Sequence, residues 1–304
     1  MGLTEFPASE NTLETALAAM DALHPGTYSR FSWSKLRYLL SKALVGHPVP
    51  YFDDTPSRPM IRGREIRVGD PTGGLTGGGT AKLITRVSEL GPLPTERCIS
   101  FGRCHVPKSP VFYGSFNEAT VLSELRPALE SIVYLLTCIP KSGVTFKSAL
   151  IGEIDYVRRH EKGSVSIPTN VHAKEIHKWI SMASTEADYV RLVTDAFIAD
   201  LFLQNTRTED NFRATSALTS LVLALESVDN PGTAEALYYP SVALNGGMNI
   251  ALTGKCFSEK VLSVSCKVVL VQRNYGYGIY KTRTLAQSER IDEDGAIHWK
   301  SSSK

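Results

Sequence analysis

The stretch from Ala81 to Pro127 constrains the fold most, because it combines short strand-like runs with a helix-like segment. Three apolar runs, LITRV, CISF and PVFYGS, are followed by ATVLSELRP. Runs of this length with β-branched and aromatic residues are typical of strands, and the last segment has apolar residues at helical spacing. The alternation predicts an α+β (mixed α/β) fold. Polar groups that a buried run does not need stand in or beside these runs: Arg86, Arg103, Tyr113 and Glu124. They indicate a pocket for an anionic, sugar-bearing ligand.

The composition is that of a globular protein. The chain has 304 residues, 42% hydrophobic and 21% charged, which is enough for one large domain or two small ones. The net charge of +2 is too balanced to predict a nucleic-acid partner.

The five cysteines are scattered and form no CxxC motif. We therefore expect no disulfide framework and a reducing, cytoplasmic setting. The histidines lack HExxH spacing, so no metal is expected. The N-terminus shows no signal-peptide pattern, and no apolar run of about 18 residues predicts a membrane span.

Apolar spacing predicts helices over residues 10–23, 30–45, 168–182, 186–204 and 211–227. Strands are expected in SIVYLLTCI, KSALIGEIDYV, ALYYPSV and residues 261–273, the last with GIYKTRTLAQ as its hairpin partner. The tail DEDGAIHWKSSSK is expected to be frayed.

Composition also predicts the domain organisation. Residues 1–79 would form an N-terminal helical segment followed by a Gly- and Pro-rich linker, which begins near His47. Residues 80–304 would form the main domain, with a core at about 80–260, a C-terminal hairpin at 261–285 and the frayed tail. The glycine-rich GGLTGGGT does not meet the phosphate-loop pattern GxxxxGK[ST], so we interpret it as linker.

Taken in order, four elements resemble the RES-domain family of NAD-degrading proteins, many of which are toxins of toxin–antitoxin pairs. These are ITRV around Arg86, GRCHVP around Arg103, PVFYGS around Tyr113 and TVLSELR around Glu124. A later element, YYPSVALNGGMNIAL, carries Ser241 and Asn249. Two positions depart from the family pattern: Thr85 replaces an aromatic residue, and His105 replaces an asparagine.

The resemblance implies a RES-type domain similar to the ADP-ribosyltransferase fold, with an extra N-terminal helical segment. It also implies an NAD glycohydrolase or NAD phosphorylase that cleaves the bond between nicotinamide and ribose. Glu124 would stabilise the cationic ribose of the transition state. Arg86 is the first choice for the NAD pyrophosphate and Arg103 the second. Tyr113 would stack on the nicotinamide, and Ser241 would bind the ribose or the carboxamide.

Asn249 is a further substrate-binding candidate, although asparagine beside glycine also forms turns. NAD would be a substrate, and no cofactor or metal is expected. The family also implies growth arrest by NAD depletion and a cognate antitoxin protein as partner. The acceptor stays open among water, phosphate and a protein side chain.

Two alternatives remain. One is an ADP-ribosyltransferase that modifies a macromolecule, with the insert 155–235 as its docking surface. The other is a non-catalytic, nucleotide-binding RES-like protein.

Overall fold

The computed structural model describes residues 10–24, 26–45, 49, 51–66, 83–163, 170–204 and 207–300. Its strands are β1 (Tyr51–Asp54), β2 (Met60–Ile66), β3 (Val111–Ser115), β4 (Ile132–Pro140), β5 (Phe146–Leu150), β6 (Ala236–Pro240), β7 (Met248–Thr253), β8 (Val261–Asn274), β9 (Tyr280–Ile291) and β10 (Ile297–Trp299). Its α-helices are α1 (Glu10–Ala22), α2 (Trp33–Ala43), α3 (Glu118–Leu125), α4 (Glu153–His160), α5 (Asn170–Met182), α6 (Glu186–Leu203), α7 (Glu209–Ser220) and α8 (Gly254–Lys260). Short 3-10 turns occupy Tyr28–Arg30, Val87–Glu89 and Thr95–Arg97.

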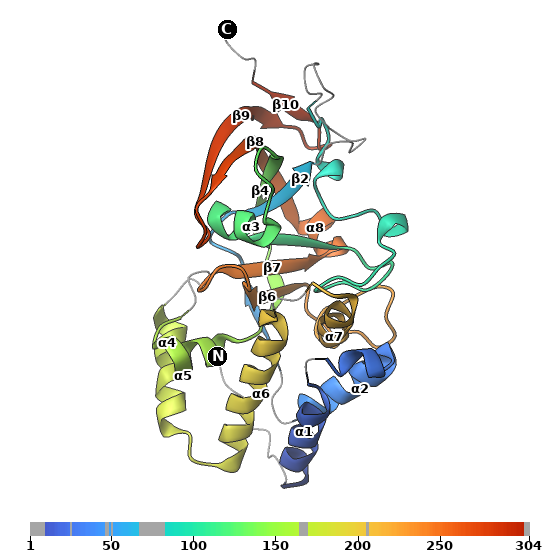
Figure 1. Cartoon of the computed structure of the whole chain (residues 1–304), viewed down its shortest axis with the longest axis vertical. Helices are drawn as coiled ribbons and strands as arrows, with labels where there is room; N and C mark the ends of the chain where they lie inside the picture. The colour runs from blue at the N-terminus through green and yellow to red at the C-terminus, as the bar shows by residue number, and fades with distance from the viewer. Residues whose placement is uncertain are drawn as a thin grey trace.

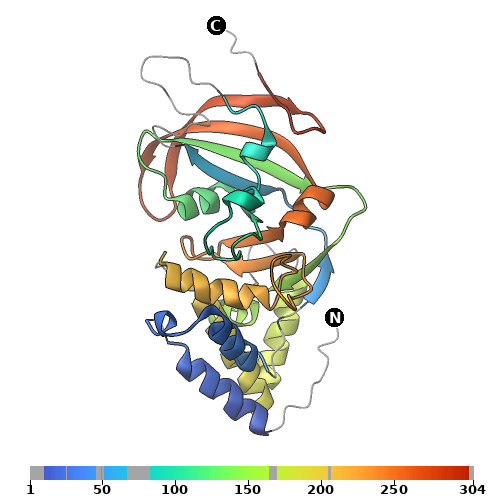
Figure 2. The same ribbon diagram turned by 90° about the vertical axis from the view of Figure 1, so that its right-hand side faces the viewer.

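The fold is α+β. Within the described ranges, the strands form one sheet in the order β1-β5-β6-β7-β3-β2-β4-β8-β9-β10. Neighbours are antiparallel except for the parallel pair of β5 and β6. Helices α1, α2 and α4–α7 gather at one end of the elongated molecule, whereas α3 and α8 lie with the strands (Figures 1 and 2).

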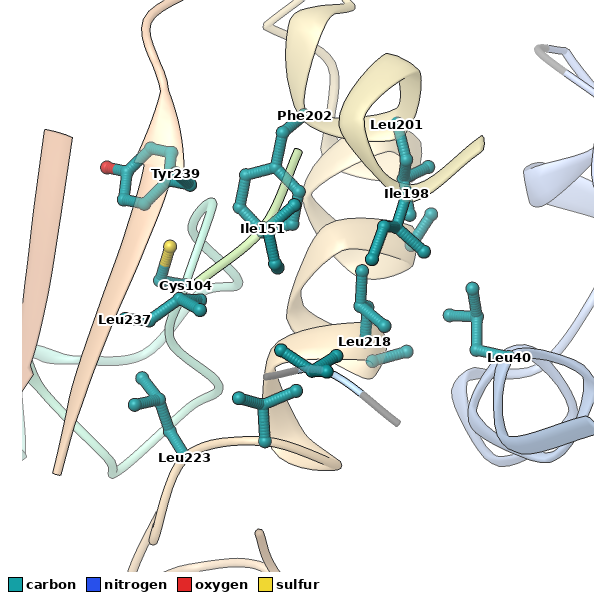
Figure 3. Packing of buried hydrophobic residues seen from close by; sticks show 14 of the residues in the cluster. Leu40, Cys104, Ile151, Ile198, Leu201, Phe202, Leu218, Leu223, Leu237 and Tyr239 are labelled. Atoms are coloured by element: carbon teal, nitrogen blue, oxygen red, sulfur yellow. The ribbon is translucent and has the colours of Figure 1, made fainter. Parts of the chain in front are cut away.

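Strand β6 is buried on both faces, and its alternate residues separate two hydrophobic clusters. Leu237 and Tyr239 belong to the cluster between the sheet and the helices. Ala236 and Tyr238 belong to the cluster on the opposite face. Figure 3 shows the first cluster, in which Phe202 of α6 lies close to Tyr239, with a ring-centroid distance of 5.1 Å. The same cluster includes Leu40 of α2 and Leu218 of α7, so helix α2 packs into the main core.

Caps at both ends fix the helix that carries Glu124. The Asn117 side chain accepts a hydrogen bond from the backbone N–H of Thr120 at 2.8 Å and so starts α3. Arg126 adopts a left-handed conformation with φ of 51° and ends the helix. Glu124 therefore lies in the last turn of a short helix that is fixed at both ends.

The expected helices at 10–23, 30–45 and 186–204 are confirmed as α1, α2 and α6, and α5 confirms the described part of 168–182. Helix α7 ends at Ser220 instead of 227, because the chain after it pairs with residues 232–234. The N–H of Ala234 donates to the carbonyl of Val222 at 2.9 Å, and the N–H of Ala224 donates to the carbonyl of Ala234 at 2.8 Å.

Several strand predictions were wrong. CISF forms no strand, and ITRV makes only an isolated bridge between Arg86 and Ala296. In KSALIGEIDYV the strand ends at Leu150 and helix α4 follows. The buried Asp195 carboxylate starts this helix by accepting the backbone N–H groups of Gly152 at 3.2 Å and Asp155 at 2.8 Å.

The predicted linker and tail also contain strands. β1 and β2 lie in the segment 47–79, where β2 pairs with β4 along its whole length. The glycine-rich residues 69–80 lie outside the described residues. β10 pairs with β9 inside the segment predicted to be frayed. All five cysteines are buried and free, and no helix in the described part of the chain could cross a membrane.

Candidate functional site

A cavity opens where strands β2 and β3 separate. The two strands pair at one position, Ile61 with Ser115. Beyond that pair, Arg62 and Gly63 of β2 and Tyr113 of β3 line a cavity of about 430 Å³. This volume lies within the range of small-molecule sites. The loop at residues 101–105, helix α3 and helix α7 also contribute to its wall.

Glu124 lines this cavity, and its carboxylate is fixed by two donors. Oε1 accepts the Ser241 hydroxyl at 2.7 Å and the Asn249 side-chain Nδ2 at 2.8 Å. Within the described residues, Oε2 has no hydrogen-bond partner. The carboxylate is thus oriented by one oxygen and can present the other to a ligand.

The two donors are themselves buried and held in place. Ser241 and Asn249 are each 4% exposed. The Ser241 hydroxyl accepts the backbone N–H groups of Ala243 and Leu244, both at 3.2 Å. The Asn249 side-chain oxygen accepts the hydroxyl of Ser115. A buried polar network in which every member is bonded is rigid, so it determines where the Glu124 carboxylate lies.

Tyr113 is positioned through its hydroxyl group. The phenol oxygen accepts the backbone N–H of Cys104 at 2.7 Å and lies 2.9 Å from Nδ1 of His105. Burial raises the pKa of the phenol well above its usual range, so the group stays protonated. Because the hydroxyl is anchored in the loop, the ring is held against the cavity.

His105 also lines the cavity, where sequence reasoning gave it no role beyond a departure from the family pattern. Burial lowers the pKa of its imidazole, so the ring is neutral at neutral pH. A neutral imidazole nitrogen can accept the proton of the Tyr113 hydroxyl. His105 therefore supports the tyrosine.

Three arginines give the cavity a positive character: Arg62, Arg103 and Arg207. Arg62 donates from Nε to the carbonyl of Leu90 at 2.7 Å and from Nη1 to that of Tyr113 at 3.4 Å. Arg103 and Arg207 donate to the carbonyls of Phe202 and Glu124. Among the described residues, no carboxylate forms an ion pair with any of the three.

Burial shifts the pKa values of two of these guanidinium groups, those of Arg62 and Arg207. Burial lowers the pKa of Arg62 to about 10, which still leaves it charged at neutral pH. Burial also lowers the pKa of Arg207, and the nearby Arg126 lowers it further. Partly desolvated cations that lack a carboxylate partner favour an anionic ligand.

A second cavity of about 670 Å³ adjoins the first and shares Arg62, Gly63, Leu125 and Arg207 with it. Arg64 and Arg97 also line it, together with Glu65 and Glu89. Together, the two cavities form an extended site with arginines at their junction. No group of three His, Cys, Asp or Glu side chains in the described part of the chain could hold a metal ion.

Of the residues expected from the sequence, the structure gathers Glu124, Tyr113, Arg103 and Asn249 around the cavity. Ser241 lies behind Glu124 and does not line it. Arg86 lines neither cavity: its side chain is 54% exposed and pairs with Asp294 at 2.8 Å. Arg62, which lies in the predicted linker, lines both cavities instead.

No protein-family model, curated protein or solved structure matches this chain.

Proposed function

We propose that this chain is a RES-type enzyme that cleaves the bond between nicotinamide and ribose in NAD. The observation that carries the proposal is the Glu124 carboxylate, fixed through Oε1 by Ser241 and Asn249 at the wall of a cationic cavity. Strands β2 and β3 pair at a single position and separate beside the cavity. This separation supports the expectation of an ADP-ribosyltransferase-like fold.

The chemistry explains why a fixed carboxylate is needed. When the C1′–N1 bond breaks, its electron pair goes to the ring nitrogen, and nicotinamide leaves as a neutral molecule. Positive charge then develops on C1′ and the ring oxygen of the ribose. A negative Glu124 carboxylate near that charge stabilises the transition state more than the ground state.

The other residues serve binding. Tyr113 would offer its ring to the nicotinamide, in the orientation that the anchored hydroxyl imposes. Arg62 and Arg207, at the junction of the two cavities, suit the pyrophosphate, because guanidinium groups bind phosphate oxygens in pairs. The second cavity would then hold the adenosine half. In this assignment Ser241 and Asn249 position Glu124.

The acceptor completes the reaction. Water that bonds to C1′ gives ADP-ribose and releases one proton, whereas phosphate gives a phosphorylated ADP-ribose. In keeping with the family resemblance, we further propose that NAD depletion inhibits growth and that a protein antitoxin covers the site.

Incubation of the purified protein with NAD tests the proposal. We expect free nicotinamide, with ADP-ribose in phosphate-free buffer if water is the acceptor. A new product that requires phosphate would identify a phosphorylase. Label from NAD attached to a macromolecule would identify a transferase, and NAD binding without turnover would identify a non-catalytic binding protein.

A further inference from the structure

The turn between β8 and β9 exposes aromatic side chains in a strained backbone. Gly276, Tyr277 and Gly278 all have positive φ, at 82°, 54° and 77°. Tyr277 is 95% exposed, and Tyr275 and Ile279 are also exposed. A left-handed tyrosine costs about 1–2 kcal/mol. A strained residue that buries nothing gives no packing energy in return, which points to function.

The same turn carries unbalanced positive charge. Residues 261–288 contain no aspartate or glutamate. Arg273 lies directly opposite Lys281 in the strand register, and Arg283 shares the face of Lys281 by strand alternation. Like charges directly opposite one another destabilise a strand pair. Among the described residues, none of the three has a carboxylate partner, so an anionic ligand would relieve the repulsion.

The turn lies against the elements that carry the candidate site. A Cβ atom built on Gly278 would be 2.8 Å from the Ser123 hydroxyl and 2.6 Å from Leu244. Ser123 precedes Glu124, and Leu244 donates its N–H to Ser241. Tyr280 packs with the cluster that anchors α3. In Figure 1 the β8–β9 turn accordingly lies beside α3.

Arg126 extends the positive charge from the turn to the cavity. It is exposed at the C-terminal end of α3. Its charge acts both on Tyr280 of the hairpin and on Arg207 of the cavity wall. Arg126 therefore lies near both the hairpin and the cavity wall.

We propose that the β8–β9 tip (Arg273, Tyr275, Tyr277, Lys281 and Arg283) binds a single-stranded nucleic acid and holds it beside the cavity. Exposed tyrosines next to unpaired cations are what single strands require, because bases stack on the rings while the cations follow the phosphates. Arg273 already lies over the Tyr275 ring, 5.2 Å from its centroid. The proximity of the NAD site rests on the proposed function, whereas the binding itself does not.

Fluorescence anisotropy with labelled oligothymidylate and oligouridylate of about 15 nucleotides tests the proposal. The full-length protein should bind, with a slope of log affinity against log salt of about −2 for three phosphate contacts. Tyr277→Ala should weaken binding about fivefold or more, and Tyr277→Phe should retain it. Arg273→Glu should weaken binding further and make the slope shallower.

Helix α2 offers matched controls. Tyr38 is as exposed as Tyr275, at 53%, and is flanked by Lys35 and Lys42. Tyr38→Ala and Lys35→Glu repeat the two changes away from the tip and should leave affinity unchanged.

Absence of binding by the wild type at low salt would overturn the proposal. So would equal binding by Tyr277→Ala, or displacement of the oligonucleotide by a polyglutamate peptide at equal charge concentration, since the surface would then recognise charge alone. The assay contains no NAD, so its failure leaves the proposed NAD cleavage standing. Failure of NAD cleavage would likewise leave a positive binding result intact.

Discussion

Replacing Ser241 by alanine removes one of the two hydrogen bonds that orient Glu124. The hydroxyl donates to Oε1 at 2.7 Å, which is a short bond to a charged group. Ser241 is buried behind the carboxylate, so the change leaves the cavity wall intact. We therefore expect kcat for nicotinamide release to fall, with little change in KM.

The size of the effect follows from the bond. A hydrogen bond to a charged group contributes about 1.5–3 kcal/mol. If all of it is lost from the transition state, the rate falls roughly 10- to 150-fold. The two backbone N–H groups that lose their acceptor, of Ala243 and Leu244, lie at the long distance of 3.2 Å. Their loss should cost about 1 kcal/mol of unfolding free energy.

The assay pairs steady-state nicotinamide release with urea unfolding. Ser148→Ala is the matched control: Ser148 is fully buried on β5, and its hydroxyl makes only a 3.5 Å contact with the carbonyl of Phe146. It should change neither kcat nor the position of Glu124. A folded Ser241→Ala variant with wild-type kcat would refute the idea that this hydroxyl positions the carboxylate.

Further predictions concern binding, packing and pH. Arg62→Ala should raise KM for NAD about tenfold or more, since it removes a cation at the cavity junction. Arg86→Ala, which breaks only an exposed pair with Asp294, should leave KM unchanged. If Arg86→Ala raised KM and Arg62→Ala did not, Arg86 would be the residue that binds the pyrophosphate. Gly63→Ala should destabilise the protein by about 1–3 kcal/mol in urea unfolding, because the added Cβ would lie 2.5 Å from side-chain atoms of α3; an unchanged midpoint would contradict this packing. Burial lowers the pKa of His105 in the folded protein, so its imidazole binds a proton more readily in the unfolded state. Stability should therefore be full above the ordinary histidine pKa of about 6.5 and fall below it. His105→Asn should remove that part of the decline, and identical pH profiles would show that His105 does not contribute.

The sequence predicted the helices better than the strands, for a physical reason. Helices α1, α2 and α6 each bury one face, so their apolar residues recur at local spacing. β10 exists only because β9 pairs with it, and such non-local pairing leaves little local pattern.

Some residues of the candidate site could be predicted from the sequence, and others could not. The order of the motifs pointed to Glu124, Ser241 and Asn249, which lie far apart in sequence and meet through hydrogen bonds. Arg62 escaped notice because it lies between proline- and glycine-rich segments that resemble a linker. The segment MIRGREI gave no strand alternation, because Arg62, Gly63, Arg64 and Glu65 separate the apolar residues at its two ends, and only Met60 and Ile66 are buried.

His105 shows why contacts cannot be inferred from a motif alone. Its position in the loop after Phe101 gave no helical or strand pattern. Its role depends on Gly102, since a Cβ there would lie 2.2 Å from the imidazole ring. This close approach is visible only in three dimensions.

The most direct test of the account is the Glu124→Gln variant, assayed for nicotinamide release and for NAD binding under the same conditions. Glutamine keeps the shape of the side chain and an oxygen for Ser241 and Asn249, but removes the negative charge. We predict that the variant binds NAD and loses at least about 100-fold in kcat. Nicotinamide release at the wild-type rate would contradict the account.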